Sequence, residues 1–334
     1  MKSRQFSTLL LGCVCAAAPL ACAVNTDEDV ETIRQALPQK DSLQLNGPET
    51  NAAAASAADA GAAPTDAPYA TFYAFTRQVR DGVNKITAGV LGTVWFIVHT
   101  TPTTKGNGQA VWGPYTDSLE PATWRFRVTR AGDHEYDYVL EGRPKESSSD
   151  QDYKTVLSGF GYSKQDPKHG DGQFMVDLDA ARALDPVAHP DESGTVTVIH
   201  DLPPTVTEVW APLPREIQVT LAPSVTHEHL DIVSVAREDN TGVIIIDGAA
   251  DVDASKTTAL EDVTVASQWN SAGAGRSDVT LAGGDVPASV SPVTLVECWD
   301  TRFKQSYYKD TAGIAAQAGD INACAFANAA AIDP

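Results

Sequence analysis

The chain has 334 residues, with 24 basic and 44 acidic side chains, and its formal net charge is −20 at pH 7. A surface this acidic repels phosphate backbones and anionic headgroups, so we expect no nucleic acid among its partners. The excess of acid favours solubility instead.

Residues 1–21 are predicted to be an export signal. Lys2 and Arg4 precede an apolar segment that is shorter than the roughly 20 apolar residues of a membrane-spanning helix. The segment ends in Leu20-Ala21-Cys22, which is similar to the end of a bacterial lipobox, although Pro19 stands where that motif usually has leucine. In a lipobox the cysteine is acylated and becomes the new N-terminus.

Lipidation at Cys22 is the favoured interpretation, and it predicts a protein anchored to a membrane by acyl chains. Ala23 follows the cysteine, and by resemblance to enteric lipoproteins this favours the outer membrane, facing the periplasm or the cell surface. Two alternatives stay open. Cys13 ends a second lipobox-like segment, and ordinary signal-peptidase cleavage after Ala23 would leave a secreted soluble protein.

Residues 22–68 are predicted to form a lipid attachment site, a short leader and a flexible tether. Val30, Ile33 and Leu37 recur at helical spacing, and Leu43 and Leu45 alternate as a short strand does. Residues 51–68 are dominated by alanine, with no apolar face to dock. We therefore expect a single folded domain over residues 69–334.

The domain is predicted to begin with one long helix of about 28 residues, which ends before Pro102. Apolar residues recur there every three or four positions, at Phe72, Phe75, Val79, Val83, Ile86, Val90, Val94 and Ile97.

After Pro102 the apolar period changes from 3.6 to 2, which predicts β-strands. Gly132-Asp133, Asp239–Gly242 and Ser271–Gly275 are predicted turns between neighbouring strands. About ten short strands in one antiparallel meander should curl, because a twisted sheet of this width does not stay flat. The predicted fold is therefore mainly β (α+β): a barrel or half-barrel with the long helix packed on it.

Two cysteines remain for a disulfide once the signal is removed and Cys22 is acylated. An exported chain should oxidise Cys298 and Cys324 to each other. The alternative is two buried free thiols.

Three sequence blocks resemble a set of uncharacterised exported lipoproteins of the gram-negative cell envelope. The blocks are Trp112–Tyr115, Gly273–Asp278 and Glu297–Asp300, followed by Phe303, Tyr307, Tyr308 and Cys324. The resemblance covers most of the chain after residue 69 and implies no activity. At the level of architecture, the predicted fold is also similar to the open barrels that carry lipoproteins or lipids across the periplasm, an analogy of fold alone.

A curled sheet facing a helix suggests an apolar concave surface, so a lipid or another apolar ligand is one candidate partner. Trp95, Trp112, Trp124 and Phe126 are the candidate lining residues. The alternative is that large aliphatic side chains fill this space as a packed core.

Two polar constellations are candidate sites. Arg276 and Asp278 share one face of a predicted strand and are candidates for contacting a ligand head group, or else they form an exposed ion pair. His227, His229 and Asp231 share one side of another strand and are a candidate metal site without a fourth ligand, or else a solvated rim. The acidic bend with Asp247, Asp251 and Asp253 lacks the order of a calcium loop.

No nucleophile elbow, phosphate-binding loop or dinucleotide fingerprint stands in the chain, so we predict no catalytic residues and no cofactor. The sequence predicts a non-enzymatic envelope lipoprotein with a structural, interaction or lipid-binding role. The alternative is a secreted hydrolase or metal-binding protein whose site is assembled only in three dimensions.

Overall fold

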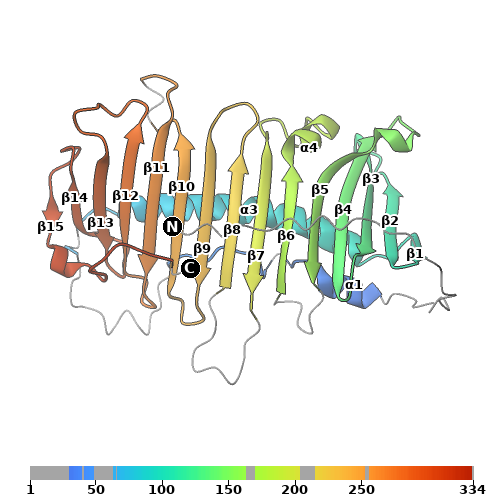
Figure 1. Ribbon diagram of the computed structural model, residues 1–334, viewed down its shortest axis with the longest axis horizontal. Coiled ribbons are helices and arrows are strands. Elements are labelled where there is room, and N and C mark those ends of the chain that lie inside the picture. The colour runs from blue at the N-terminus through green and yellow to red at the C-terminus, as the bar shows by residue number, and fades with distance from the viewer. Residues whose placement is uncertain are drawn as a thin grey trace, which may run out of the picture.

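The computed structural model describes residues 30–39, 41–48, 63–64, 66–162, 170–203, 215–252 and 256–332. One antiparallel sheet dominates it, with fifteen strands in strict sequence order from β1 to β15 (Figure 1). The strands are β1 Thr104–Gly106, β2 Gln109–Tyr115, β3 Ala122–Arg130, β4 Glu135–Pro144, β5 Lys154–Tyr162, β6 Gly170–Asp177, β7 Thr195–Leu202, β8 Arg215–Ala222, β9 His229–Ala236, β10 Gly242–Ala250, β11 Glu261–Trp269, β12 Gly275–Gly283, β13 Val293–Trp299, β14 Gln305–Asp310 and β15 Ala318–Gly319.

The described residues contain three α-helices. Helix α1 is Val30–Ala36, α3 is Thr71–Val98 and α4 is Leu178–Leu184. The long helix lies where the sequence predicts it, whereas α4 interrupts a region for which the sequence predicts only strands. Asp177 ends β6 and caps α4, because its Oδ1 accepts a hydrogen bond from the backbone N–H of Ala180 at 2.8 Å.

The antiparallel meander predicted from the sequence is confirmed, but the barrel or half-barrel closure and the count of ten strands are wrong. The sheet is open, with β1 and β15 at opposite ends of the row of strands (Figure 1). Both edge strands are short, three and two residues, which limits edge-to-edge association.

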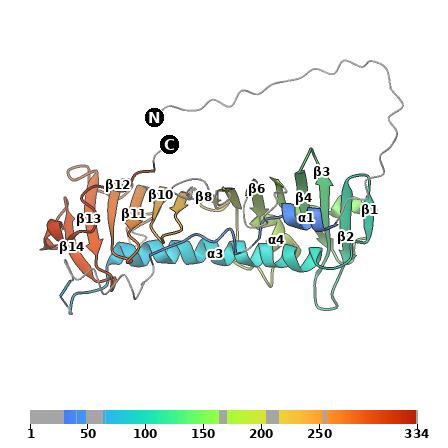
Figure 2. The same ribbon diagram turned by 90° about the horizontal axis from the view of Figure 1, so that it is seen from below.

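Helix α3 explains why the sheet does not close. It runs along the row of strands against one face, which we call the inner face (Figure 2). At 1.5 Å per residue its length is about 42 Å, and at 4.8 Å per strand this is the width of about nine strands. Closing the sheet into a barrel would bend the row of strands into a circle. A straight helix packed along that row opposes this bending.

A buried carboxylate fixes the N-terminal end of α3 to the sheet. Glu297 of β13 is fully buried, and its two oxygens accept hydrogen bonds from the N–H groups of Thr71 at 2.9 Å and Phe72 at 2.6 Å. Gln305 Nε2 donates a third bond at 2.9 Å. Burial raises the pKa of Glu297, an effect that the hydrogen bonds from Phe72, Thr71 and Gln305 offset in part.

The C-terminal end of α3 is fixed near the opposite edge of the sheet. Trp112 of β2 donates from Nε1 to the carbonyl of Thr100 at 3.1 Å, and Arg34 of α1 donates from Nε to the carbonyl of Val98 at 2.8 Å. The two attachments therefore span the sheet from β13 to β2.

The leader contributes to the core of this domain. Ile33 and Leu37 in and after α1, and Leu43 and Leu45 beyond it, are at most 4 % exposed in the main apolar cluster. Leu43 and Leu45 form no strand. Instead the side chain of Asn84 on α3 pairs with the backbone of Leu45, accepting from its N–H at 2.7 Å and donating to its carbonyl at 3.0 Å. The chain from α1 onward therefore packs in the same core as α3. Residues 51–62, most of the predicted tether, lie outside the described residues.

Aromatic side chains lie over glycines of neighbouring strands at several points of the inner face. Trp269 is paired with Gly242, and Trp299 is paired with Gly275. A Cβ atom added at Gly242 would lie 2.3 Å from the Trp269 ring, and one at Gly275 would lie 2.2 Å from the Trp299 ring. These glycines are needed because an indole ring fills the space above them.

This packing predicts that Gly275→Ala lowers the free energy of unfolding by about 1–3 kcal/mol, the usual cost of overpacking. Gly82→Ala is the matched control. Gly82 is exposed on α3 with no atom near the added Cβ, so alanine there should raise the free energy of unfolding by about 0.5–1 kcal/mol. Urea unfolding of both variants measures the two values, and a neutral or stabilising Gly275→Ala would contradict the packing.

The raised pKa of Glu297 predicts a pH dependence of stability. The folded state holds this proton more tightly than the unfolded state, so its contribution is present below the unfolded pKa, near 4.5, and is lost as pH rises through the folded pKa. Unfolding free energies of wild type and Glu297→Gln should be measured from pH 4 to pH 8. We expect the wild type to lose more stability over this range than the variant. Parallel pH profiles would contradict a raised pKa.

Candidate functional site

The space between α3 and the sheet is a packed core. Ile232, Ile246, Val265 and Val279 stand side by side on the inner faces of β9 to β12 and are 1–3 % exposed. Together with the buried face of α3 they belong to one continuous apolar cluster. Large aliphatic side chains therefore occupy the place where the sequence allowed an apolar ligand.

The four predicted lining residues are dispersed. Trp112 and Phe126 are fully buried in the core, with ring centroids 5.9 Å apart. Trp124 packs between this core and a small cluster beneath α4. Trp95 is 54 % exposed on the outside of α3, where its ring lies 4.1 Å from that of His99. These side chains do not meet around one cavity in the described part of the chain.

Trp95 and His99 do border a groove between α1 and the end of α3, together with Glu31 and Arg34. Its volume is about 130 Å³. Pockets for drug-sized ligands enclose at least ~300 Å³, so this groove is too small for a lipid tail.

The opposite face of the sheet, which we call the outer face, is crossed by the last described residues. This C-terminal strap, residues 320–332, is the dark red segment that passes in front of the strands in Figure 1. A disulfide joins Cys298 of β13 to Cys324 in the strap, which confirms the predicted pairing. Gln268 Nε2 donates to the carbonyl of Asn328 at 2.7 Å.

Arg276 and Asp278 also hold the strap. Arg276 donates from Nη1 to the carbonyls of Phe326 at 3.3 Å and Ala327 at 2.6 Å. Its Nε and Nη2 donate to the two oxygens of Asp278 at 2.8 and 2.7 Å. The guanidinium is thereby committed to the chain itself, and it is not presented to a head group.

The predicted metal ligands His227, His229 and Asp231 do not gather into a site. No three His, Cys, Asp or Glu side chains in the described ranges are placed to hold a metal ion. His229 and Asp231 share one face of β9, but alternate residues of a strand lie about 7 Å apart. Asp231 accepts a hydrogen bond from Thr220 at 2.7 Å. Asp253 of the acidic bend lies outside the described residues.

Hydroxyl and carboxylate groups form a row across the uncovered part of the outer face. Seven paired positions on β7 to β13 make up the row, and all are exposed or half-exposed: Thr197, Thr220, Asp231, Asp247, Thr264, Thr280 and Thr294. Asp231 and Asp247 are direct cross-strand neighbours, an arrangement in which like charges repel. Threonine hydroxyls of Thr220 and Thr264 donate to them at 2.7 and 2.6 Å.

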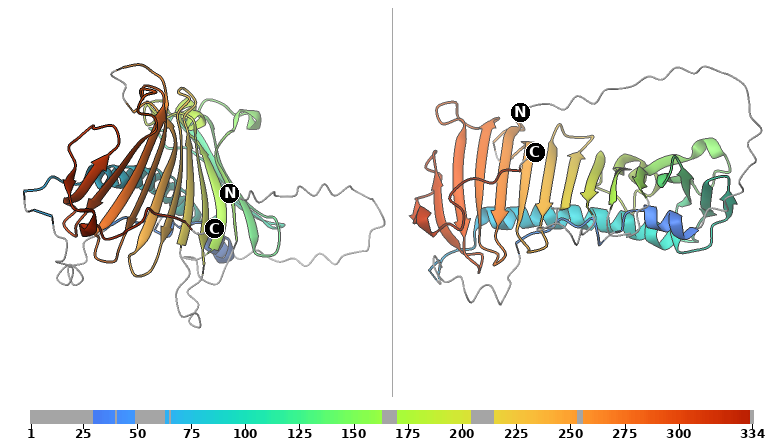
Figure 3. Two further views of the ribbon diagram at one scale, coloured as in Figure 1. Left: turned by 60° about the vertical axis from the view of Figure 1, so that its left-hand side comes forward. Right: turned by 60° about the horizontal axis from the view of Figure 1, so that its bottom comes forward.

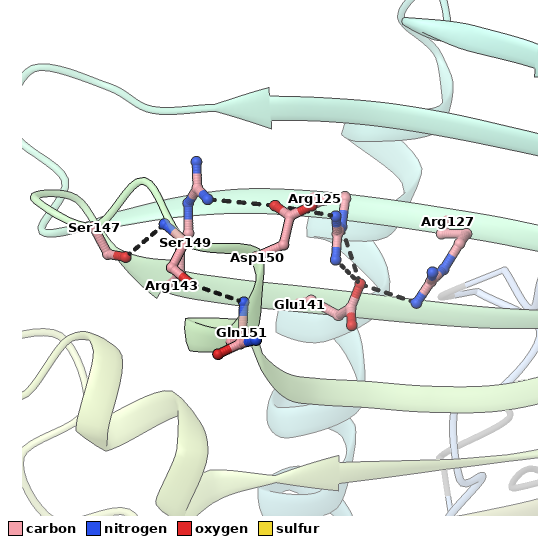
Figure 4. Close-up of polar contacts among 8 residues, drawn as sticks. All are labelled: Arg125, Arg127, Glu141, Arg143, Ser147, Ser149, Asp150 and Gln151. Atoms are coloured by element: carbon pink, nitrogen blue, oxygen red, sulfur yellow. Dashed lines mark hydrogen bonds and ion pairs between the residues drawn. The ribbon is translucent and has the colours of Figure 1, made fainter.

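A different charge pattern occupies the outer face at the β3–β4 end of the sheet. Five side chains, which we call the arginine cluster, alternate in sign in the order Arg143, Asp150, Arg125, Glu141 and Arg127 (Figure 4). The three arginines come from β3 and β4. Asp150 is brought over them by the loop before β5, whose turn is fixed by Ser147 and Ser149 hydroxyls accepting from backbone N–H groups at 3.1 and 3.2 Å.

The arginine cluster carries one positive charge more than its carboxylates balance. Glu141 Oε2 takes bonds from Arg125 Nε at 3.1 Å and Arg127 Nη2 at 3.2 Å. Asp150 Oδ1 lies 3.4 Å from Arg143 Nη1 and 3.9 Å from Arg125 Nη1. The row of five side chains begins and ends with an arginine. Arg143 and Arg127 therefore each contact only one carboxylate of the cluster.

Most donors of the two terminal arginines are unused. Among the described residues, Arg127 donates only through Nη2 and Arg143 only through Nη1. The Nε of Arg143 is buried and has no hydrogen-bond acceptor. A guanidinium has five N–H donors, so unfilled hydrogen-bonding capacity remains at this position.

The ring of Tyr153 holds two of the guanidiniums in place. The central carbon of Arg125 lies 3.9 Å from the ring centroid and that of Arg143 lies 4.8 Å from it. Such cation–π contacts limit the rotamer freedom of long side chains, so less entropy is lost when they bind.

These arginines are not among the site residues predicted from the sequence, although the sequence carries a signal for them. Six of the 24 basic residues fall within residues 125–154. Residues 163–334 carry 26 acidic and 10 basic side chains, whereas residues 104–162 carry nine and seven. The charge of the chain is therefore polarised along the row of strands, and the nearly neutral end coincides with the arginine cluster.

No family model matches the chain, and neither a curated protein nor a solved structure matches it. Among the described residues, none of the helices combines the length and apolar character needed to cross a bilayer. The predicted signal and the acylation site Cys22 lie outside the described residues.

Proposed function

We propose that this protein is an exported envelope lipoprotein, anchored through Cys22, whose role is recognition rather than catalysis or lipid carriage. The observation that carries the proposal is the contrast between the two faces of the sheet. The inner face is filled by α3 and the leader, while a broad polar part of the outer face is left open.

The packed inner face speaks against carriage of an apolar ligand. A carrier needs an enclosed apolar volume, and the side chains that line this space, such as Phe126 and Ile232, are fully buried in one continuous apolar cluster. Opening such a volume would require α3 to leave the sheet and expose its buried stripe to water.

The open face supports binding to an envelope partner. Its hydroxyl–carboxylate row offers exposed donors and acceptors at regular strand spacing, and the arginine cluster adds fixed charge at one end. A wide, rigid and pre-formed polar surface loses little entropy on binding.

Photocrosslinking in the producing cell tests the proposal. A photoreactive amino acid at Thr280, on the open outer face, should give a discrete crosslinked product. The same residue at Gln78, on the exposed side of α3, is the matched control and should give none. Membrane fractionation should show release of the protein in Cys22→Ala.

Mass spectrometry of an organic extract of the purified protein tests the rival role. The packed core predicts no lipid beyond the acyl anchor. One extractable lipid per chain, or crosslinks at Gln78 alone, would contradict recognition through the outer face.

A further inference from the structure

The geometry points to a binding site for a monovalent oxyanion, a carboxylate or a phosphodiester, at the arginine cluster. The inference rests on the proposed function only in taking the outer face as the binding surface, and it requires no membrane anchor. It assigns a ligand chemistry to side chains that the core and the strap do not use.

The charge balance of the arginine cluster favours an anion with a single charge. Three guanidiniums and two carboxylates leave one positive charge on the cluster. A single negative charge neutralises it, whereas a dianion would leave an excess of negative charge in a protein that is already strongly acidic. The cluster therefore matches a monoanion best.

The arginines of the cluster also have unused hydrogen-bonding capacity. Planar guanidiniums bind carboxylate and phosphate oxygens through two parallel N–H donors. Arg127 and Arg143 each use one nitrogen on the protein, and the buried Nε of Arg143 has no acceptor in the described part of the chain. The Nε of Arg143 is too buried for an anion to reach, so the free nitrogens of the half-exposed Arg127 supply the donors for an oxyanion.

One arginine of the cluster is accessible to solvent, and the other two are held in place. The side chain of Arg127 is 38 % exposed, so an anion can reach it, while those of Arg125 and Arg143 are 21 and 13 % exposed. Contact with Tyr153 holds Arg125 and Arg143 in place. The site combines one accessible arginine with two arginines that the fold has already ordered.

Anion titration of the purified protein tests the site. Acetate and dimethyl phosphate serve as the carboxylate and phosphodiester probes, at constant ionic strength set with sodium chloride. The readout is the NMR signal of each arginine Nε–H group. We expect a saturable shift of the Arg127 signal with at least one of the two probes. The responding probe assigns the ligand class. No saturable shift with either probe would overturn the site.

Three variants separate binding from structural damage. Arg127→Gln removes the surplus charge and should weaken the apparent affinity at least fivefold. Glu141→Gln removes a competing carboxylate and should strengthen it, an effect that misfolding does not produce. Arg182→Gln is the matched control, because Arg182 forms a comparable exposed ion pair with Asp179 at 2.7 Å on α4. Equal affinities in all variants would contradict the site.

Vesicle co-sedimentation distinguishes a free group from a lipid headgroup if dimethyl phosphate binds. Vesicles of phosphatidylcholine with and without phosphatidylglycerol are the probes, with Cys22→Ala protein so that no acyl anchor contributes. Binding that needs phosphatidylglycerol and is lost in Arg127→Gln places the phosphodiester on a membrane. Binding of dimethyl phosphate without vesicle binding assigns a soluble or protein-borne group. Failure of the outer-face crosslink with intact anion binding would count against the proposed function alone.

Discussion

The long helix α3 is the constraint on which the rest of the structure depends. A straight rod of about 42 Å lies across the strands and is attached at both ends, through Glu297 on β13 and through Trp112 on β2. Figure 3 shows the sheet following this rod without closing on itself. A meander of this width usually curls. Here the helix covers the inner face, and the outer face is left to solvent and to the C-terminal strap.

Complementary side-chain shapes determine the packing of the inner face. Aromatic rings lie over glycines, as Trp299 does over Gly275, and the small polar chain from Thr76 through Ser267 to Ser277 satisfies buried hydroxyls at 2.8 and 2.6 Å. The outer face is specified by polarity, apart from the part that the C-terminal strap covers. The disulfide and Arg276 hold the strap there, so a side chain that the sequence offered as a candidate ligand contact binds the chain itself.

Much of the fold could be predicted from the sequence, because periodicity reports burial. The long helix, the antiparallel order and the turn at Asn240 follow from apolar spacing and from turn residues. β5 gives only a weak strand signal in the sequence, because Gly159 and Gly161 stand where alternating apolar side chains would be expected. These glycines exist because a neighbouring ring and a backbone carbonyl occupy the space of their side chains, which is long-range information. Closure was mispredicted because no local pattern reveals that α3 crosses the sheet.

The candidate site was harder to predict for a related reason. Arg125 and Arg127 alternate with apolar residues as any solvated strand face does, and only the return of the chain through Glu141, Arg143 and Asp150 makes them a cluster. If α3 keeps the sheet from closing, the two ends of the row of strands lie far apart. Electron–electron distance measurement between spin labels at Tyr115→Cys on β2 and Lys309→Cys on β14 tests this directly. The open sheet predicts a separation of roughly 45–60 Å, from twelve strand spacings. A distance below about 25 Å would show a closed barrel and contradict the account.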